Sequence, residues 1–243
     1  SWKPSVLVMS GVTDCYQPVE RHLKITRGCL EVLLEFRNPV GIISKNRLVA
    51  RDADLLRELA RLGAARVTLS ITTLDAELAR ELEPRTSTPR DRLEAVRELS
   101  AAGVPVNVNV APIIPGLNDH EIPRILEAAA QAGALTAGWT MLRLPGAVKD
   151  VFLEWIERHH PTKKGRILSR IREIRGGKLN ESHFGQRMTG TGIFSEQIRA
   201  LFEAAARRYG GPELRVSEEK LEAERQTRLA DYRRRFVDGT REF

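Results

Sequence analysis

Short hydrophobic segments that end in polar residues recur along this chain, and each is followed by a helical pattern. Three such segments occupy residues 40–43, 66–69 and 106–110, and hydroxyl, amino or amide side chains follow them. Parallel strands joined by helices give this alternation, and in a βα barrel the carboxyl ends of the strands meet at one face. The pattern therefore predicts where a functional site lies before any motif is considered.

Five strand–helix units are expected in regular alternation. We predict strands at residues 5–10, 40–44, 67–71, 104–110 and 136–142, with helices at 18–37, 52–62, 89–102 and 121–132. Regular alternation favours parallel pairing through right-handed crossovers. The predicted fold class is α/β, a partial TIM-like (β/α) barrel of parallel strands with a C-terminal helical extension.

Three parts are expected along the chain. Residues 1–145 form the partial βα barrel, residues 146–212 a basic helical extension that closes it, and residues 213–243 a charged helical tail. Within these last two parts, helices are predicted at residues 148–160, 162–175, 195–209 and 217–237, and a glycine-rich irregular segment at 176–192.

The basic excess of the chain is local. The net charge is +7, and residues 161–190 alone carry eight Lys and Arg residues against two Glu residues. A local basic patch favours an anionic partner such as nucleic acid. A solvated helix face is the alternative and the more ordinary explanation.

The sequence carries no sign of a membrane protein or of a disulfide scaffold. No apolar run approaches the roughly 20 residues that span a bilayer, and no signal peptide opens the chain. The only cysteines are Cys15 and Cys29, which fits a reducing compartment. We therefore expect a cytoplasmic protein with no membrane partner.

Several strand-end segments are specific enough to indicate a family. They are Thr13-Asp14-Cys15-Tyr16-Gln17-Pro18-Val19-Glu20, Ile43-Ser44-Lys45, Ser70-Ile71-Thr72-Thr73, the loop at 111–119, Leu142-Arg143-Leu144-Pro145, and Arg175-Gly176-Gly177-Lys178-Leu179-Asn180. In this order and spacing they resemble radical S-adenosylmethionine (radical SAM) proteins, in particular the spore photoproduct lyase-related branch. The resemblance extends over about residues 5–192.

The resemblance implies S-adenosylmethionine, a [4Fe–4S] cluster and an electron donor. In such proteins three cysteines spaced Cys-x3-Cys-x2-Cys hold the cluster after the first strand, and reductive cleavage of S-adenosylmethionine gives a 5′-deoxyadenosyl radical that acts on a substrate. This chain has only two cysteines, fourteen positions apart, and neither matches a cluster ligand. We expect that the first strand and cluster loop lie in an N-terminal segment missing here, so that this chain alone is inactive. Natural loss of the cluster is the alternative.

The resemblance places cofactor-binding residues at the first three strand ends: Thr13, Asp14, Lys45, Ser70 and Thr72. The ammonium of Lys45 suits the carboxylate of S-adenosylmethionine, and relatives have a lysine at the matching strand end; a snorkelling surface lysine is the alternative. The hydroxyls of Ser70 and Thr72 suit the ribose or the carboxylate. Turn chemistry is the alternative for these hydroxyls and for Thr13 and Asp14.

Further site residues are expected on the last two strands. Asn109 lies on a polar strand face, with Asn107, and points to a cavity unless the amides satisfy one another. In the family the loop at 112–119 carries the adenine, so Ile114 would pack against the ring and Gly116 would allow close approach. Asn118 as a helix cap is the ordinary alternative. Arg143 would bind a substrate carboxylate or phosphate, or form a structural ion pair.

Two functions remain open from the sequence. The first is a radical SAM enzyme whose substrate is unknown. The second is a nucleic-acid-binding or cluster-less regulatory barrel that uses the basic segment at 161–190. In the lyase a thiol near the end of the matching strand returns hydrogen to the lesion, and Gly11 stands at the comparable position here, with Cys15 beyond it. This difference argues against photoproduct repair.

Overall fold

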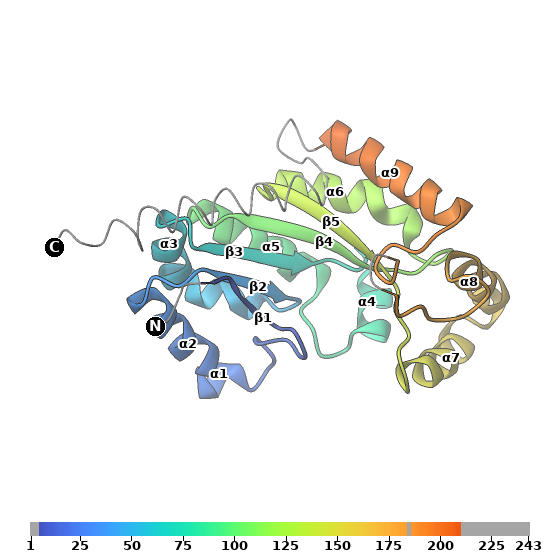
Figure 1. Cartoon of the computed structure of the whole chain (residues 1–243), viewed down its shortest axis with the longest axis horizontal. Helices are drawn as coiled ribbons and strands as arrows, with labels where there is room; N and C mark the ends of the chain where they lie inside the picture. Colours follow the sequence, from blue (N-terminus) through green and yellow to red (C-terminus); the bar gives the residue numbers. More distant parts are fainter. Residues whose placement is uncertain (1–4, 184–185, 210–243) are drawn as a thin grey trace.

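The centre of the protein is one parallel sheet with helices packed along it. The computed structural model describes residues 5–183 and 186–209. Its strands lie in sequence order and are β1 (Leu7–Met9), β2 (Val40–Ser44), β3 (Ala65–Ser70), β4 (Val106–Ile113) and β5 (Thr136–Met141). The connecting helices include α2 (Ile25–Glu35), α3 (Ala53–Arg61), α5 (Pro89–Ala101) and α6 (Ile122–Gln131), as Figure 1 shows. The predicted α/β partial barrel is confirmed.

The two faces of the sheet differ in polarity. Leu69 and Val108 point to the helical face and are fully buried. On the other face Thr68 and Asn107 are paired in register, and the amide Nδ2 of Asn107 donates to Thr68 Oγ1 at 3.3 Å. Thr136 Oγ1 donates to Asn107 Oδ1 at 2.8 Å. The amide of Asn107 is therefore satisfied by hydroxyls on the neighbouring strands β3 and β5, and not by the amide of Asn109 as the sequence alternative expected.

The single helix predicted at residues 18–37 is wrong in one respect. It is split into α1 (Glu20–Leu23) and α2, because Lys24 has a left-handed backbone with a φ of 51°. The carboxylate of Glu20 accepts the backbone N–H of Thr26, at the start of α2, and a bond from Arg51. A tertiary contact thus caps a new helix where local propensity predicts continuation.

Helix α4 (Ala76–Leu82) lies between β3 and α5 and was not predicted from the sequence. Asp75 caps it by accepting the backbone N–H groups of Glu77 and Leu78. Two short 3-10 turns, η1 (Arg47–Asp52) and η2 (Asp119–Glu121), precede α3 and α6. The α4 helix ends next to Glu83 and contributes Leu78 to a second hydrophobic cluster. The other buried residues of this cluster are Ile114, Leu117, Leu142, Leu144, Phe152, Ile156, Ile167, Leu168 and Ile171.

The C-terminal extension is helical and lies against the strand ends. It contains α7 (Val148–His159), α8 (Pro161–Ile174) and α9 (Ile193–Tyr209). Figure 1 shows α7 and α8 beyond the carboxyl ends of the strands and α9 beside α6. The helix predicted at 217–237 lies outside the described residues, and the three-part division stays a prediction. Within the described residues, no helix is long and apolar enough to span a membrane.

We predict that Phe202→Ala destabilises the fold by about 3–5 kcal/mol, because the ring is fully buried between α9 and the sheet, 6.4 Å from the Trp139 ring. Urea unfolding monitored by circular dichroism measures this. The neighbouring Leu201→Ala, at a side chain that is 38% exposed, is the matched control and should cost no more than about 0.5 kcal/mol. Equal losses for both variants would show that α9 does not dock on α6 and β5.

Candidate functional site

The carboxylate of Asp14 joins the loop after β1 to the end of β2. It accepts hydrogen bonds from Ser44 Oγ at 2.9 Å, from the backbone N of Lys45 at 2.8 Å and from the backbone N of Tyr16 at 2.9 Å. The bond from the backbone N of Tyr16 closes the turn that was the alternative considered for Asp14. Thr13 is exposed beside it. Asp14 therefore fixes the backbone from which the side chain of Lys45 extends.

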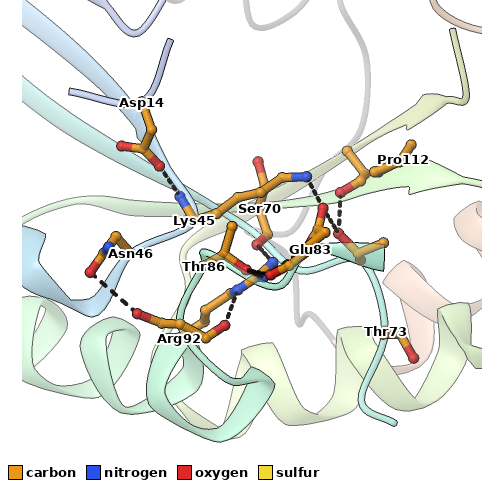
Figure 2. Close-up of polar contacts among 12 residues, drawn as sticks. Asp14, Lys45, Asn46, Ser70, Thr73, Glu83, Thr86, Arg92 and Pro112 are labelled. Carbon is orange, nitrogen blue, oxygen red and sulfur yellow. Dashed lines mark hydrogen bonds and ion pairs between the residues drawn. The ribbon is translucent and has the colours of Figure 1, made fainter. Parts of the chain in front are cut away.

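The ammonium of Lys45 forms an ion pair with Glu83 at the carboxyl end of the sheet (Figure 2). Glu83 also accepts from Thr72 Oγ1 at 2.9 Å and from Arg92 Nη2 at 2.7 Å. The side chains of Glu83 and Arg92 are only 9% and 2% exposed, whereas that of Lys45 is 29% exposed. Lys45 is thus the member of this cluster that solvent and a ligand can reach.

Glu83 is held in its charged form. Burial works to raise the pKa of this carboxyl, but the positive charges of Lys45 and Arg92 outweigh burial and hold the pKa below its ordinary value. Within this group of three, two cations face one carboxylate. The group therefore keeps an excess positive charge, and the exposed part of it is the ammonium of Lys45.

Arg92 ties this cluster to the end of β3. Its Nη1 donates to the carbonyl of Ser70 at 2.9 Å and its Nε to the carbonyl of Ser87 at 2.9 Å. Ser70 is buried and lies beside Asn109 in the register of β3 and β4. Asn109 is half-buried, and its Nδ2 donates to Thr140 Oγ1 at 3.4 Å. Lys45, Ser70, Thr72 and Asn109 are therefore gathered on neighbouring strand ends.

Asn118 closes the loop after β4. Its Oδ1 accepts from the backbone N of Ile114 at 2.7 Å, and its Nδ2 donates to the carbonyls of Thr72 at 2.7 Å and Pro112 at 3.0 Å. Asn118 is the N-cap residue of η2, as the alternative expected, but its side chain makes no capping hydrogen bond there. The amide instead joins this loop to the end of β3.

Two predicted adenine-binding residues are covered by the extension. Ile114 is fully buried in the second hydrophobic cluster. Gly116 has a φ of +86°, and a Cβ there would lie 3.1 Å from Nη1 of Arg170. Arg166 Nη2 donates to the carbonyl of Gly116 at 3.2 Å. The close approach that Gly116 allows is thus made by α8, and the side chain of Ile114 presents no open surface.

Arg143 and Arg175 lie together at the end of β5. The two Nη atoms of Arg175 donate to the carbonyls of Leu142 at 2.8 Å and Gln186 at 3.0 Å. The Nε atoms of both arginines are buried without a hydrogen-bond partner. Among the described residues Arg143 forms no ion pair, so the structural ion pair considered for it is not found.

The basic segment at 161–190 is largely used within the chain. Lys164 pairs with Glu157, and Arg166 donates to Gly116. Arg170 lies 3.6 Å from Asp119 and over the ring of Phe194. Arg175 is buried. Much of this charge therefore positions α8 against the loop after β4.

The described residues do not fit a three-cysteine cluster. Across residues 5–183 and 186–209 no group of three His, Cys, Asp or Glu side chains is placed to hold a metal ion. Cys15 and Cys29 are free thiols, one half-buried and one exposed. Burial raises the pKa of Cys15, which lowers the thiolate fraction that iron would need.

Comparison with known proteins decides the family. The family model of the radical SAM superfamily matches residues 2–129, more than half of the chain. The chain belongs to the radical SAM superfamily. The resemblance drawn from the strand-end motifs is therefore confirmed.

The chain also resembles curated proteins in sequence. The chain is 33% identical over 187 residues to uncharacterised proteins of Mycobacterium tuberculosis and Mycobacterium bovis, covering 75% of this chain and 54% of theirs. It is 35% identical over 106 residues to the FeMo cofactor biosynthesis protein NifB of Klebsiella pneumoniae, covering 38% of this chain and 22% of NifB. This radical SAM chain thus spans about half the length of the mycobacterial relatives that it matches.

A cysteine-to-serine mutant of spore photoproduct lyase shares the radical SAM fold of this chain, with a TM-score of 0.61 and 16% identity over 87% of this chain and 60% of the lyase. A complex of the lyase with a dinucleoside spore photoproduct gives the same TM-score of 0.61. At this level of identity the likeness shows the fold alone.

Sequence reasoning missed Glu83 and Arg92, which contact the strand ends, and it noted Arg175 only within a family motif, without a role. One signal was available for Arg92, because it occupies the buried stripe of α5 with Val96 and Leu99. A charged residue on an apolar helical stripe indicates a buried partner. Nothing local marks Glu83 as that partner, because they meet only through the turn after α4.

We predict that Glu83→Gln lowers the free energy of unfolding by roughly 3 kcal/mol at neutral pH, since it leaves Arg92 buried without its carboxylate. Because the pKa of Glu83 is lowered in the folded state, its contribution is complete above the ordinary value of 4.5 and is lost as pH falls through the lowered pKa. Urea unfolding of both proteins between pH 7 and about pH 3 should show the difference shrinking.

Glu77→Gln, on the exposed surface of α4, is the matched control for Glu83→Gln. It should change the stability little at any pH. A Glu83→Gln effect as small as the control, or one independent of pH, would contradict the buried ion-pair cluster.

Proposed function

We propose that the strand ends of this protein form a cradle for S-adenosylmethionine and that the chain is the cofactor-binding part of a radical SAM enzyme. The observation that carries the proposal is the cluster of Lys45, Glu83 and Arg92. Two cations share one buried carboxylate, and the ammonium of Lys45 is the partly exposed member. A carboxylate of the cofactor would complete the charge balance at this ammonium.

The other cradle residues supply neutral hydrogen-bonding groups around Lys45. Thr72 and Ser70 end β3, and Asn109 lies beside Ser70 on β4. Hydroxyl and amide groups suit the ribose and the amino acid portion of S-adenosylmethionine. Asp14, with Thr13 beside it, would act by holding the backbone of Lys45.

The loop after β4 would contact the adenine through its backbone rather than its side chains. Ile114 and Gly116 are covered by the second hydrophobic cluster and by α8. Asn118 already fixes the loop on the end of β3. Hydrogen bonds from a fixed backbone can read the edge of a base without any exposed side chain.

When bound, S-adenosylmethionine would supply the 5′-deoxyadenosyl radical on reductive cleavage. The residues present do not fit the [4Fe–4S] cluster, so no step is assigned to a cluster in these 243 residues. The proposal therefore requires cluster ligands and an electron donor from outside this sequence.

Nucleic-acid binding through the segment at 161–190 is the weaker candidate. Arg166, Arg170 and Arg175 are directed at the chain itself, which leaves fewer cations for phosphates. A spore photoproduct lyase bound to a dinucleoside shares the fold, but a shared fold alone does not show which substrate a protein binds.

We predict that Lys45→Ala weakens S-adenosylmethionine binding about 10- to 100-fold, the loss expected for one charge-assisted hydrogen bond. Isothermal titration calorimetry, on the protein supplied with the cluster ligands that the proposal requires and reconstituted anaerobically, measures the affinity. Lys149→Ala, at an exposed lysine on α7, is the matched control and should bind as the wild type does. Equal affinities for Lys45→Ala and wild type would remove Lys45 from the site.

A further inference from the structure

Two arginines at the end of β5 carry more positive charge than the described residues around them balance. Arg143 follows the last residue of β5 by two positions, and Arg175 follows the last residue of α8. Burial first, and then the charge of Arg143, lower the pKa of Arg175, so the two guanidinium groups lie close enough to repel each other. Neither forms an ion pair with a described residue.

Arg175 is held rigidly in place. Its side chain is among the largest that are fully buried, and the residue is only 2% exposed. Its Nη atoms donate to the carbonyls of Leu142 and Gln186, on either side of the end of β5. These bonds leave its Nε, as well as the Nε of Arg143, buried without a partner. Two donors on two neighbouring cations therefore remain unsatisfied at one strand end.

Two other buried or half-buried arginines of this fold are compensated by carboxylates. Arg92 is paired with Glu83, and Arg51 is paired with both Glu20 and Asp52. Burying an unpaired cation and an unsatisfied donor costs several kcal/mol in general. Arg143 and Arg175 have no such carboxylate partner among the described residues.

Glu181 is the carboxylate that partly opposes this excess. It raises the pKa of Arg175, but less than burial and Arg143 lower it. Hydrogen bonds from the backbone and the ring of His183 and from the backbone of Ser182 hold the pKa of Glu181 at about 2. Its Oε1 is thus engaged by its own loop, and among the described residues Glu181 makes no ion pair with either arginine.

We propose that Arg143 and Arg175 form an oxyanion subsite that binds a phosphate group of the substrate. The guanidinium of the half-buried Arg143 can donate two parallel hydrogen bonds to an oxyanion, whereas Arg175, whose Nη atoms are engaged, adds its charge and its unpartnered Nε. Two cations match the charge of a phosphate better than that of a carboxylate. The end of β5 lies beside the end of β4, where Leu142 N donates to the carbonyl of Ile113 at 2.9 Å. Its role as a substrate subsite rests on the proposed function, because the subsite would lie at the same edge of the sheet as the cradle.

The test is titration of this chain with inorganic phosphate, at constant ionic strength, by isothermal titration calorimetry. Wild type should bind phosphate saturably and more tightly than acetate. Arg143→Gln should weaken binding about tenfold or more, and Arg143→Lys should restore only part of it, because the ammonium lacks the guanidinium fork. Arg90→Gln, at an exposed arginine on α5, is the matched control and should bind as the wild type does.

A second variant guards against misfolding. Arg175→Lys keeps the charge of the buried position, and its fold is checked by circular dichroism and thermal unfolding; a folded variant with weaker phosphate binding supports the subsite. Absence of saturable phosphate binding, equal binding of acetate, or an Arg143→Gln variant with unchanged affinity would each overturn it.

Titration with S-adenosylmethionine separates this subsite from the proposed function. Arg143→Gln should leave the affinity for S-adenosylmethionine, measured as for Lys45→Ala, unchanged. If Arg143→Gln loses phosphate binding but keeps its affinity for S-adenosylmethionine, then separate residues bind the two ligands. Phosphate binding retained by a protein that never binds the cofactor would overturn the proposed function and leave the oxyanion subsite standing.

Discussion

The carboxylate of Glu83 is buried between the ammonium of Lys45 and the guanidinium of Arg92, and the strand-end region depends on this contact. A buried arginine needs an anion, and Glu83 is the anion that the chain provides. Through Arg92 and Thr72 the same carboxylate reaches the end of β3, and through Lys45 it reaches the end of β2. One ion-paired cluster therefore sets the spacing of two strand ends, α4 and α5.

This arrangement explains how a lysine can stand ready for a ligand in a folded protein. A lysine at a strand end with no internal partner would favour solvent, whereas Lys45 is held by Glu83 and by the backbone bond to Asp14. Because Arg92 also neutralises Glu83, Lys45 keeps the capacity to bind a further anion. Radical SAM membership makes the carboxylate of S-adenosylmethionine the proposed anion.

The five strands were predictable because each is a short apolar or alternating segment between helical patterns, and their ends fall within three residues of the expected positions. The break at Lys24 and helix α4 were not, because the first depends on the contact of Glu20 with Thr26 and Arg51, and the second has only seven residues. Lys45, Ser70 and Thr72 were predicted as cofactor-binding residues from their place after strands, and this role stays a prediction. Glu83 and Arg92 were missed because their contacts with Lys45 and the end of β3 depend on the fold, and Arg175 was noted only within a family motif.

The most direct test of the cradle is a crystal structure of the protein with S-adenosylmethionine bound. The account predicts that Nζ of Lys45 lies about 3 Å from the cofactor carboxylate, with Glu83 still bound to Arg92. A cofactor bound away from the ends of β2 and β3, or a Lys45 that contacts only Glu83, would contradict it.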